Sequence, residues 1–171
     1  GKYLLLDRDE KYSLYTFLGE KIFGSIFSDV FQEGSFILFE NEEGKIYVTT
    51  SDKLEGEILN LNYRANFIYD DFEYFEDDKI LLFSNEKEEL LDSDMNQIIS
   101  LDSQLIEKNS FGWTASSDFG IRIVGDKVSI PFSFLYDDIV YSEKYFIGKR
   151  NGYWELRDIQ EDSLILDNLD S

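Results

Sequence analysis

Apolar and polar residues alternate along most of this chain in short runs, and turn-forming residues separate the runs. The clearest pair of runs, 145–150 and 153–158, lies on either side of Asn151-Gly152. Asn-Gly is the strongest short signal for a β-hairpin, because a type I′ turn needs positive φ at both central residues. A two-residue turn there sets Ile147 opposite Leu156, and we predict that these two residues form a buried cross-strand pair.

The two faces of this hairpin follow from the alternation of side chains along a strand. One face carries Tyr145, Ile147, Lys149, Trp154, Leu156 and Asp158, and the other carries Phe146, Gly148, Arg150, Tyr153, Glu155 and Arg157. Since the first face holds the aliphatic pair, we expect that face to turn inward. Upstream, Pro131 and Asp137-Asp138 indicate a bend before the hairpin.

Fainter copies of the hairpin recur upstream. In a second copy, which follows Tyr69-Asp70-Asp71, Asn85, Glu89, Leu90 and Asp92 match Asn151, Glu155, Leu156 and Asp158 with one residue inserted. A partial copy at the N-terminus sets Leu5 opposite Leu14, again as an inward contact. Further copies start at Asp29 and Asp102. The anchors at 29, 71, 102 and 138 are 42, 31 and 36 residues apart, and such uneven spacing is typical of a degenerate repeat array.

One stretch of about thirty residues resembles a known family. It contains Ile130-Pro131, Tyr136-Asp137-Asp138-Ile139, Asn151-Gly152-Tyr153-Trp154 and Asp158. This pattern resembles the bacterial WG β-repeat family, whose units carry an Ile-Pro…Tyr-Asp segment and a hairpin that closes on Asn-Gly-x-Trp-Gly. The resemblance implies tandem β-hairpins and a binding or scaffold role, and it implies no catalytic residue. The chain departs from the family at Glu155, where the family has Gly, and the other copies lack the Trp.

These patterns predict an all-β chain that forms one β-repeat domain over 1–171. The tandem hairpins are expected near 3–15, 36–50, 80–92, 111–123 and 145–158, and the tail after 162 is expected to add a closing strand. The array can stack as a solenoid or close as a small propeller-like ring.

Residues 86–106 leave an alternative open. Leu91, Met95 and Ile98 lie near helical spacing, and a helix there would make the chain α+β. We prefer strands, because a turn at Asn85-Glu86 sets Leu81 opposite Leu90 as the repeat requires.

Composition excludes several classes of enzyme. The chain has no cysteine and no histidine, which excludes Ser-His-Asp hydrolases, thiol nucleophiles and zinc sites built from thiolates or imidazoles. The chemistry that is left needs paired carboxylates or a carboxylate-held metal, and no pair stands out among the acids. No glycine-rich phosphate loop is present either. We therefore expect no enzymatic activity and no cofactor.

The segment that starts at Asp92 begins like an EF-hand calcium loop. Gln97 stands where the loop needs Gly, and Ser103 stands where it needs a bidentate Glu, so we reject an EF-hand here. Whether one of the other Asp-rich turns binds calcium stays open.

The net charge of the chain indicates which kinds of binding partner are favoured. With 16 basic and 36 acidic residues, the net charge is −20. This charge repels nucleic acid and anionic membranes and favours another protein, especially a basic one, although it also serves to keep an aromatic-rich chain soluble.

No stretch is long and apolar enough to insert into a membrane. The first residue is Gly1, so we expect an upstream segment; the compartment stays open between cytoplasmic and secreted after removal of a signal peptide. The oligomeric state is not predicted.

The densest cluster of charged and aromatic residues covers 70–78. It predicts an acidic, aromatic docking surface for a cationic segment, in which aromatic rings supply contact area and carboxylates supply attraction. The candidate residues are Asp70, Asp71, Phe72, Glu73, Tyr74, Glu76, Asp77 and Asp78. The alternative is a solvated bend in which the acids keep sticky rings from aggregating.

Together these features predict a non-enzymatic β-repeat binding or scaffold module that engages a protein or a cell-surface ligand. The alternative function is an acidic immunity or inhibitor protein that neutralises a basic partner such as a nuclease toxin. Salt dependence separates the two, because an electrostatically steered inhibitor loses association rate as ionic strength rises.

Overall fold

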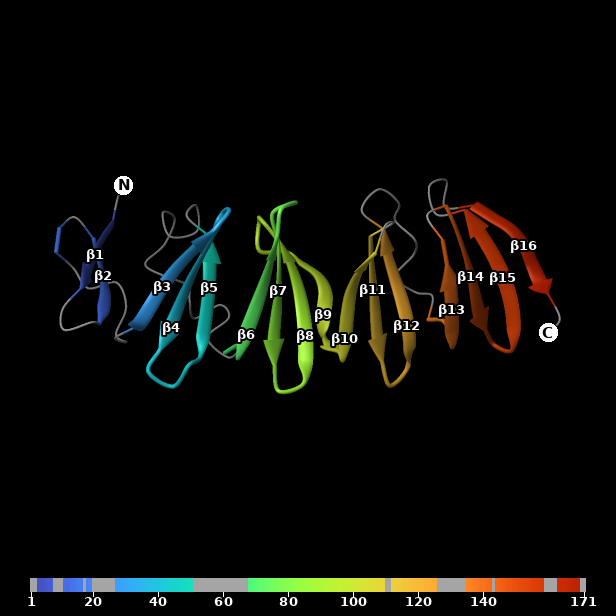
Figure 1. The fold of residues 1–171 in the computed structure, drawn as a ribbon, viewed down its shortest axis with the longest axis horizontal. Helices are drawn as coiled ribbons and strands as arrows, with labels where there is room; N and C mark the ends of the chain where they lie inside the picture. The colour runs from blue at the N-terminus through green and yellow to red at the C-terminus, as the bar shows by residue number, and fades with distance from the viewer. Residues whose placement is uncertain are drawn as a thin grey trace. The chain divides into compact units, whose positions relative to one another are not determined.

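The computed structural model describes residues 3–7, 11–16, 18–19, 27–50, 68–109, 112–125, 135–142, 144–158 and 163–169. Every regular element in these ranges is a β-strand, which confirms the all-β prediction (Figure 1). The alternative helix over 86–106 is wrong, because β8 (Lys87–Asp92), β9 (Gln97–Ser103) and the start of β10 (Leu105–Asn109) occupy that stretch. Within the same ranges there is no helix long and apolar enough to cross a membrane.

The strands of the described ranges form four sheets. In the first, β1 (Tyr3–Asp7), β2 (Tyr12–Thr16), β3 (Phe27–Glu33), β4 (Phe36–Asn41) and β5 (Ile46–Thr50) lie in sequence order. The second contains β6 (Asp71–Phe75), β7 (Lys79–Ser84), β8 and β9. The third contains β10, β11 (Gly112–Ser117) and β12 (Gly120–Gly125). The last, here called the terminal sheet, contains β13 (Asp138–Tyr141), β14 (Tyr145–Arg150), β15 (Tyr153–Asp158) and β16 (Ser163–Leu169).

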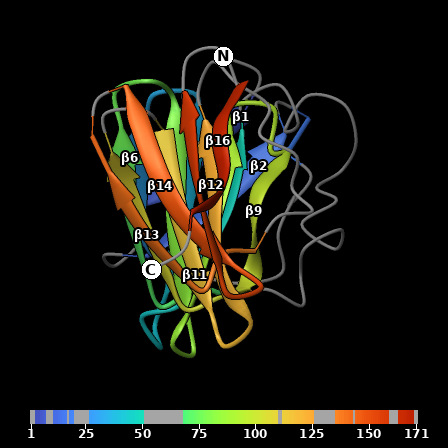
Figure 2. The same ribbon diagram turned by 90° about the vertical axis from the view of Figure 1, so that its right-hand side faces the viewer.

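The chain divides into two compact units. The first comprises residues 1–86 and 90–97, and the second comprises residues 87–89 and 98–171. In the first unit, aromatic rings of the first sheet pack against rings of β6. The ring centroids of Phe31 and Phe72 are 6.1 Å apart, and those of Phe36 and Tyr74 are 6.4 Å apart. In the second unit, Figure 2 shows β13, β14 and β16 in front of β11 and β12.

Turn chemistry sets the registers that the sequence predicted. Ile147 is opposite Leu156, and Leu5 is opposite Leu14. Asn151 and Gly152 have φ of 53° and 84°, as a type I′ turn requires. The side chains of Leu5 and Leu14 lie outside the described residues, so their predicted inward contact stays a prediction.

An isolated β-bridge made by a tyrosine precedes two of the sheets. Tyr69 pairs with Ile46, and Tyr136 pairs with Ile121. The N–H group of the residue after each tyrosine then donates to the next hairpin, from Asp70 to the Phe83 carbonyl and from Asp137 to the Lys149 carbonyl, both at 2.7 Å. The Tyr-Asp-Asp motif therefore connects each of these hairpins to the strand before it.

The third repeat starts later than predicted. Gln104 donates its N–H to the Ser116 carbonyl at 2.7 Å, which is the bond that Asp70 and Asp137 make in the other copies. The residue that matches the anchors Asp71 and Asp138 is therefore Leu105, three residues after the predicted anchor Asp102. Ser103 takes the place of the tyrosine and is likewise buried.

The predicted inward face of the last hairpin is also wrong. Ile147 is 38% exposed, whereas Phe146 is fully buried and Gly148, Glu155 and Arg157 are buried with it. Tyr136 lies against Gly148, and its ring meets Phe146 edge-to-face at 5.4 Å between centroids. Two aromatic rings bury more apolar area than one isoleucine and one leucine, so the aromatic face becomes the core face although it carries charges.

Candidate functional site

The outer face of the terminal sheet carries a row of aliphatic residues that crosses all four strands. Val140 on β13 is opposite Ile147 on β14, and Ile147 is opposite Leu156 on β15. Leu156 is opposite Leu166 on β16, where the register shifts on either side of this pair. Directly opposed residues point to the same side of a sheet. We call these four residues the aliphatic row; Val140 is 59% exposed and Leu166 is 50% exposed.

Aromatic and basic side chains flank the aliphatic row on the same face. Lys149 lies 5.8 Å from the centre of the Trp154 ring, and Lys144 lies 5.1 Å from the centre of the Tyr145 ring. Lys144 also forms an ion pair with Asp158 at 3.6 Å. The outer face is thus an apolar band with a lysine stacked on an aromatic ring at either side.

Exposed hydrophobic residues are concentrated on this sheet. Of the twelve large hydrophobic residues exposed in the described part of the chain, eight belong to β13–β16. They lie on both faces of the sheet, since Tyr141, Tyr153 and Leu164 oppose Phe146, Arg150 and Arg157 of the other face. On the outer face, Val140, Ile147 and Leu166 are neighbours, and adjoining exposed apolar residues can mark an interaction site.

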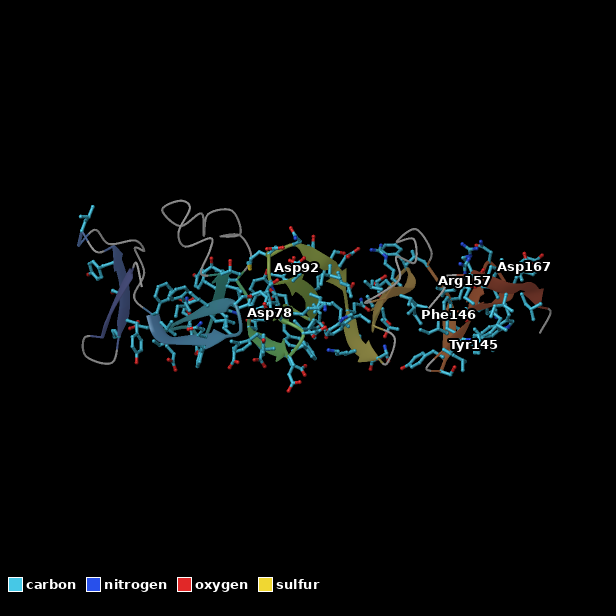
Figure 3. The ribbon with its side chains drawn as sticks, turned by 90° about the horizontal axis from the view of Figure 1, so that it is seen from above. Asp78, Asp92, Tyr145, Phe146, Arg157 and Asp167 are labelled. Carbon is cyan, nitrogen blue, oxygen red and sulfur yellow. The ribbon has the colours of Figure 1, made fainter. Side chains whose placement is uncertain are left out.

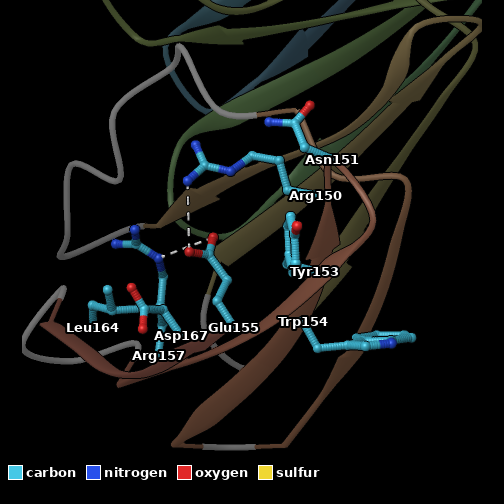
Figure 4. A pocket seen from close by; sticks show the side chains of 8 residues that line it. All are labelled: Arg150, Asn151, Tyr153, Trp154, Glu155, Arg157, Leu164 and Asp167. Atoms are coloured by element: carbon cyan, nitrogen blue, oxygen red, sulfur yellow. Dashed lines mark ion pairs between the residues drawn. The ribbon is translucent and has the colours of Figure 1, made fainter. Parts of the chain in front are cut away.

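The inner face of the same hairpin holds a buried charge cluster. Glu155 is 6% exposed and Arg157 is 9% exposed. Arg157 Nε lies 3.4 Å from Glu155 Oε1, and Arg150 Nη2 lies 3.7 Å from Glu155 Oε2 (Figure 4). Two guanidinium groups therefore compensate a carboxylate that would be costly to bury alone. Trp154 points away from this cluster, toward the outer face.

A shallow cavity of about 320 Å³ opens beside the charge cluster. Its lining residues are Arg150, Asn151, Tyr153, Trp154, Glu155, Arg157, Leu164 and Asp167. Arg157 and Asp167, which are labelled in Figure 3, come from the neighbouring strands β15 and β16. The lining mixes both charges with aromatic rings, so it suits a polar side chain of a partner better than a purely apolar group.

Tyr136 lies behind the charge cluster. Burial raises the pKa of its hydroxyl far above the usual value of 10.0, and the facing Glu155 carboxylate adds to the rise. Its backbone is held by two hydrogen bonds to Ile121, at 2.9 and 2.8 Å. Tyr136 is therefore an uncharged core residue whose backbone is held in place.

Comparison of the two hairpin copies shows which charges are specific to the terminal sheet. Glu89 in β8 matches Glu155 and is also buried. The arginines have no counterpart, because Ser84 and Leu91 stand at the positions of Arg150 and Arg157. Sequence reasoning missed this cluster; the available signal was the same glutamate recurring at one hairpin position in two copies.

Many side chains of the predicted docking segment 70–78 make contacts within the protein. Phe72 and Tyr74 pack on the first sheet, as described above, and Phe75 is only partly exposed. Asp78 accepts a hydrogen bond from the Ser35 N–H at 3.1 Å. The hydrogen bond from Lys45, followed by that from the Asn85 N–H, lowers the pKa of Asp70.

The other acids of this segment are mostly exposed. Asp71 accepts a hydrogen bond from the Phe72 N–H, and Asp77 forms an ion pair with Lys79 at 2.5 Å. Glu73 and Glu76 are exposed to solvent. The acidic side of the segment is thus accessible while its rings are largely covered, and a docking role for the whole segment stays a prediction.

The structure also places the side chain that resembled the start of a calcium loop. Asp92 Oδ1 accepts hydrogen bonds from the N–H groups of Asp94 and Asn96, at 3.0 and 2.7 Å, and so closes the turn between β8 and β9. Across the described ranges, no group of three or more acidic side chains is arranged to hold a metal ion.

No family model matches this chain, and no curated protein matches it. The resemblance to the WG β-repeat family therefore stays a prediction. Among solved structures, Kluyveromyces lactis Hsv2 is 9% identical, with a TM-score of 0.33 over 99% of this chain and 62% of that one. The WD40 β-propeller domain of Doa1 is 11% identical, with a TM-score of 0.28 over 97% of this chain and 64% of that one. The computationally designed Ika8 protein is 9% identical, with a TM-score of 0.31 over 98% and 58%.

This chain spans about three fifths of the length of these three structures.

Proposed function

We propose that this chain is a non-enzymatic β-repeat module that binds a protein partner through the outer face of the terminal sheet. The observation that supports this proposal is the aliphatic row, which crosses four strands and is exposed on three of them. Covering this surface removes apolar area from water, which contributes roughly 25 cal/mol per Å² before the costs of association.

The shape of the surface favours a protein over a small molecule. Small-molecule sites are concave and enclose most of their ligand. The aliphatic row lies instead on a sheet face, to which each strand contributes one side chain. A surface of this kind is complementary to another flat, apolar protein surface. The WG β-repeat resemblance is part of this proposal and implies the same scaffold role.

The test compares matched lysine substitutions. Ile147→Lys places a charge in the aliphatic row, whereas Leu105→Lys changes an aliphatic residue on β10 that is 47% exposed and lies outside the row. Each protein is immobilised and exposed to lysate of the source organism, and any captured protein is purified and its affinity measured directly. We expect wild type and Leu105→Lys to bind it with equal affinity and Ile147→Lys to lose at least about 2 kcal/mol. Equal affinity for all three would refute the proposal.

A second candidate is the acidic inhibitor of a basic partner. The net charge of −20 and the exposed Glu73 and Glu76 favour it. For this function, the association rate falls steeply as salt is raised, and Glu73→Gln with Glu76→Gln lowers the rate at low salt. Binding through the aliphatic row predicts neither effect.

A further inference from the structure

We propose that the cavity beside the charge cluster binds a small free amino acid with an apolar side chain. Its carboxylate binds to Arg150 and Arg157, and its ammonium group binds to Asp167. The site is separate from the aliphatic row, because both arginines alternate with the row residues and so belong to the opposite face of the hairpin. Three observations support the proposal: the charges of the cavity are missing from another copy of the hairpin, they form two poles of opposite sign, and the cavity has the volume of such a ligand.

The hairpin does not need the charges of the cavity in order to fold. As described above, serine and leucine replace the two arginines in the hairpin β7–β8, and the matching Glu89 is still buried there. The strands that follow these hairpins, β9 and β16, are both seven residues long, and their fifth residues are Leu101 and Asp167. The same kind of antiparallel sheet therefore forms with serine or leucine at all three positions. Because the fold does not account for these three charges, they point to a ligand.

The charges that line the cavity form a positive and a negative pole. Arg150 and Arg157 both pair with Glu155, so two positive charges and one negative charge leave the cluster with a net charge of +1 (Figure 4). A guanidinium group has five N–H donors, so it can bind a second carboxylate while it pairs with the first. Asp167 lines the same cavity from β16, is exposed, and forms no ion pair with another residue that the structure describes. Its carboxylate is the pole that suits an ammonium group.

Two poles favour a free amino acid over other charged ligands. The net charge of −20 repels an anion at long range, whereas a zwitterion carries no net charge and is not repelled. A single side chain of a protein partner presents only one charge, so it satisfies one of the two poles. A free amino acid presents a carboxylate and an ammonium group together and satisfies both.

The volume of the cavity sets the size of the ligand. The cavity measures about 320 Å³, which lies at the small end of the range for small-molecule sites. At about 30 Å³ for each water-sized group, it has room for roughly ten such groups. Tyr153 and Leu164 supply apolar wall between the charged residues. These features match an amino acid with an apolar side chain of about the size of leucine.

Titration of the whole chain with L-leucine, followed by NMR chemical shifts, tests the inference. We expect saturable one-to-one binding with a dissociation constant of about 1 mM or below. Two analogues of the same shape each lack one charge: 4-methylpentanoate has no ammonium group, and leucinamide has no carboxylate. Each analogue leaves one pole without its partner, so we expect each to bind at least about tenfold more weakly than L-leucine.

Three variants separate recognition from a structural effect. Asp167→Asn removes the negative pole, so L-leucine should then bind no better than 4-methylpentanoate, whose own affinity should not fall. A change that merely loosened the sheet would weaken both ligands. Arg157→Leu introduces the residue found in the other copy and should abolish binding of both. Asp138→Asn removes an exposed acid of β13 that does not line the cavity, and it should leave every affinity unchanged.

Any of three results would overturn the inference: no saturable binding of L-leucine up to about 10 mM, equal affinity for L-leucine and its two analogues, or an affinity for L-leucine that Asp167→Asn leaves unchanged. Far-ultraviolet circular dichroism establishes that each variant is folded. Asp167 is exposed, so its variant provides the test if Arg157→Leu is unstable. Ile147→Lys should bind L-leucine as wild type does, so this inference and the proposed function fail independently of each other.

Discussion

Gly148→Ala tests how the core of the second unit is built. Gly148 is buried on β14 beneath the ring of Tyr136. A Cβ atom at this position would lie 2.5 Å from Tyr136 Cε1 and 3.2 Å from Cγ, and closer still to Cδ1. Contacts below 3.0 Å are not tolerated between carbon atoms, so either the ring or the strand must move.

Tyr136 has little room to move. Both of its backbone groups are hydrogen-bonded to Ile121, and its carbonyl oxygen would lie 2.8 Å from a Cβ atom placed at Gly120. Its ring is fully buried against Phe146. Overpacking a core in this way costs about 1–3 kcal/mol, and we expect Gly148→Ala to fall in the upper half of that range.

Urea unfolding followed by tryptophan fluorescence measures this cost. Trp113 and Trp154 are the only tryptophans, and both belong to the second unit, so the signal reports that unit. A loss of about 2 kcal/mol lowers the urea midpoint by about 1 M at a typical slope.

The control is a double-mutant cycle with Tyr136→Leu, which removes the ring that the new methyl group meets. Because the clash then disappears, the double variant should cost at least about 1 kcal/mol less than the sum of the single variants. An additive cycle, or a Gly148→Ala protein as stable as wild type, would refute the reasoning.

Three further predictions concern turns and titrations. Asn151→Ala should lower the free energy of unfolding by about 1 kcal/mol, because φ is 53° there, while Asn151→Gly should change it little; urea unfolding compares them. Stability should fall above pH 10, because the raised pKa keeps Tyr136 protonated in the folded state while its hydroxyl ionises in the unfolded chain. Tyr136→Phe should reduce this fall, which urea midpoints at about pH 9 and 11 measure. The pKa of Asp70 is lowered from 3.8, so its ionised carboxylate stabilises the fold above pH 3.8, and this contribution is lost as the pH falls further. Unfolding followed by circular dichroism should therefore show that wild type and Asp70→Asn converge in stability in acid.

Local turn chemistry made the hairpin registers predictable. Asn151-Gly152 admits a two-residue turn, and that turn alone sets Ile147 opposite Leu156. The same reasoning located the strands of 86–106, where helical spacing competed with the repeat. Register depends on residues that are adjacent in sequence, so one sequence is sufficient to predict it.

The direction of each face depends on residues that are distant in sequence. Ile147 and Leu156 form the more aliphatic pair, but Tyr136 packs on the opposite face and brings Phe146 into the core. Two arginines then make a buried Glu155 tolerable. None of this is visible in the alternation of one hairpin, because both faces carry apolar residues.

The third repeat and the acidic segment show the same limit. Ser103 stands where the other copies have tyrosine, so the sequence carried no aromatic signal for the true start of that repeat. At 70–78, the sequence correctly located rings among acids but could not show that Phe72 and Tyr74 pack on Phe31 and Phe36. The partner of an aromatic residue is set by the packing of sheets and not by its neighbours in sequence.

The central claim is that the terminal sheet turns its aromatic face inward and leaves the aliphatic row exposed. The chain has no cysteine, so Ile147→Cys and Phe146→Cys each introduce a single thiol at adjacent positions on opposite faces of β14. The most direct test is the rate at which each thiol reacts with a maleimide in dilute, folded protein. The account predicts rapid labelling of Ile147→Cys and slow labelling of Phe146→Cys, and the reverse order would contradict it.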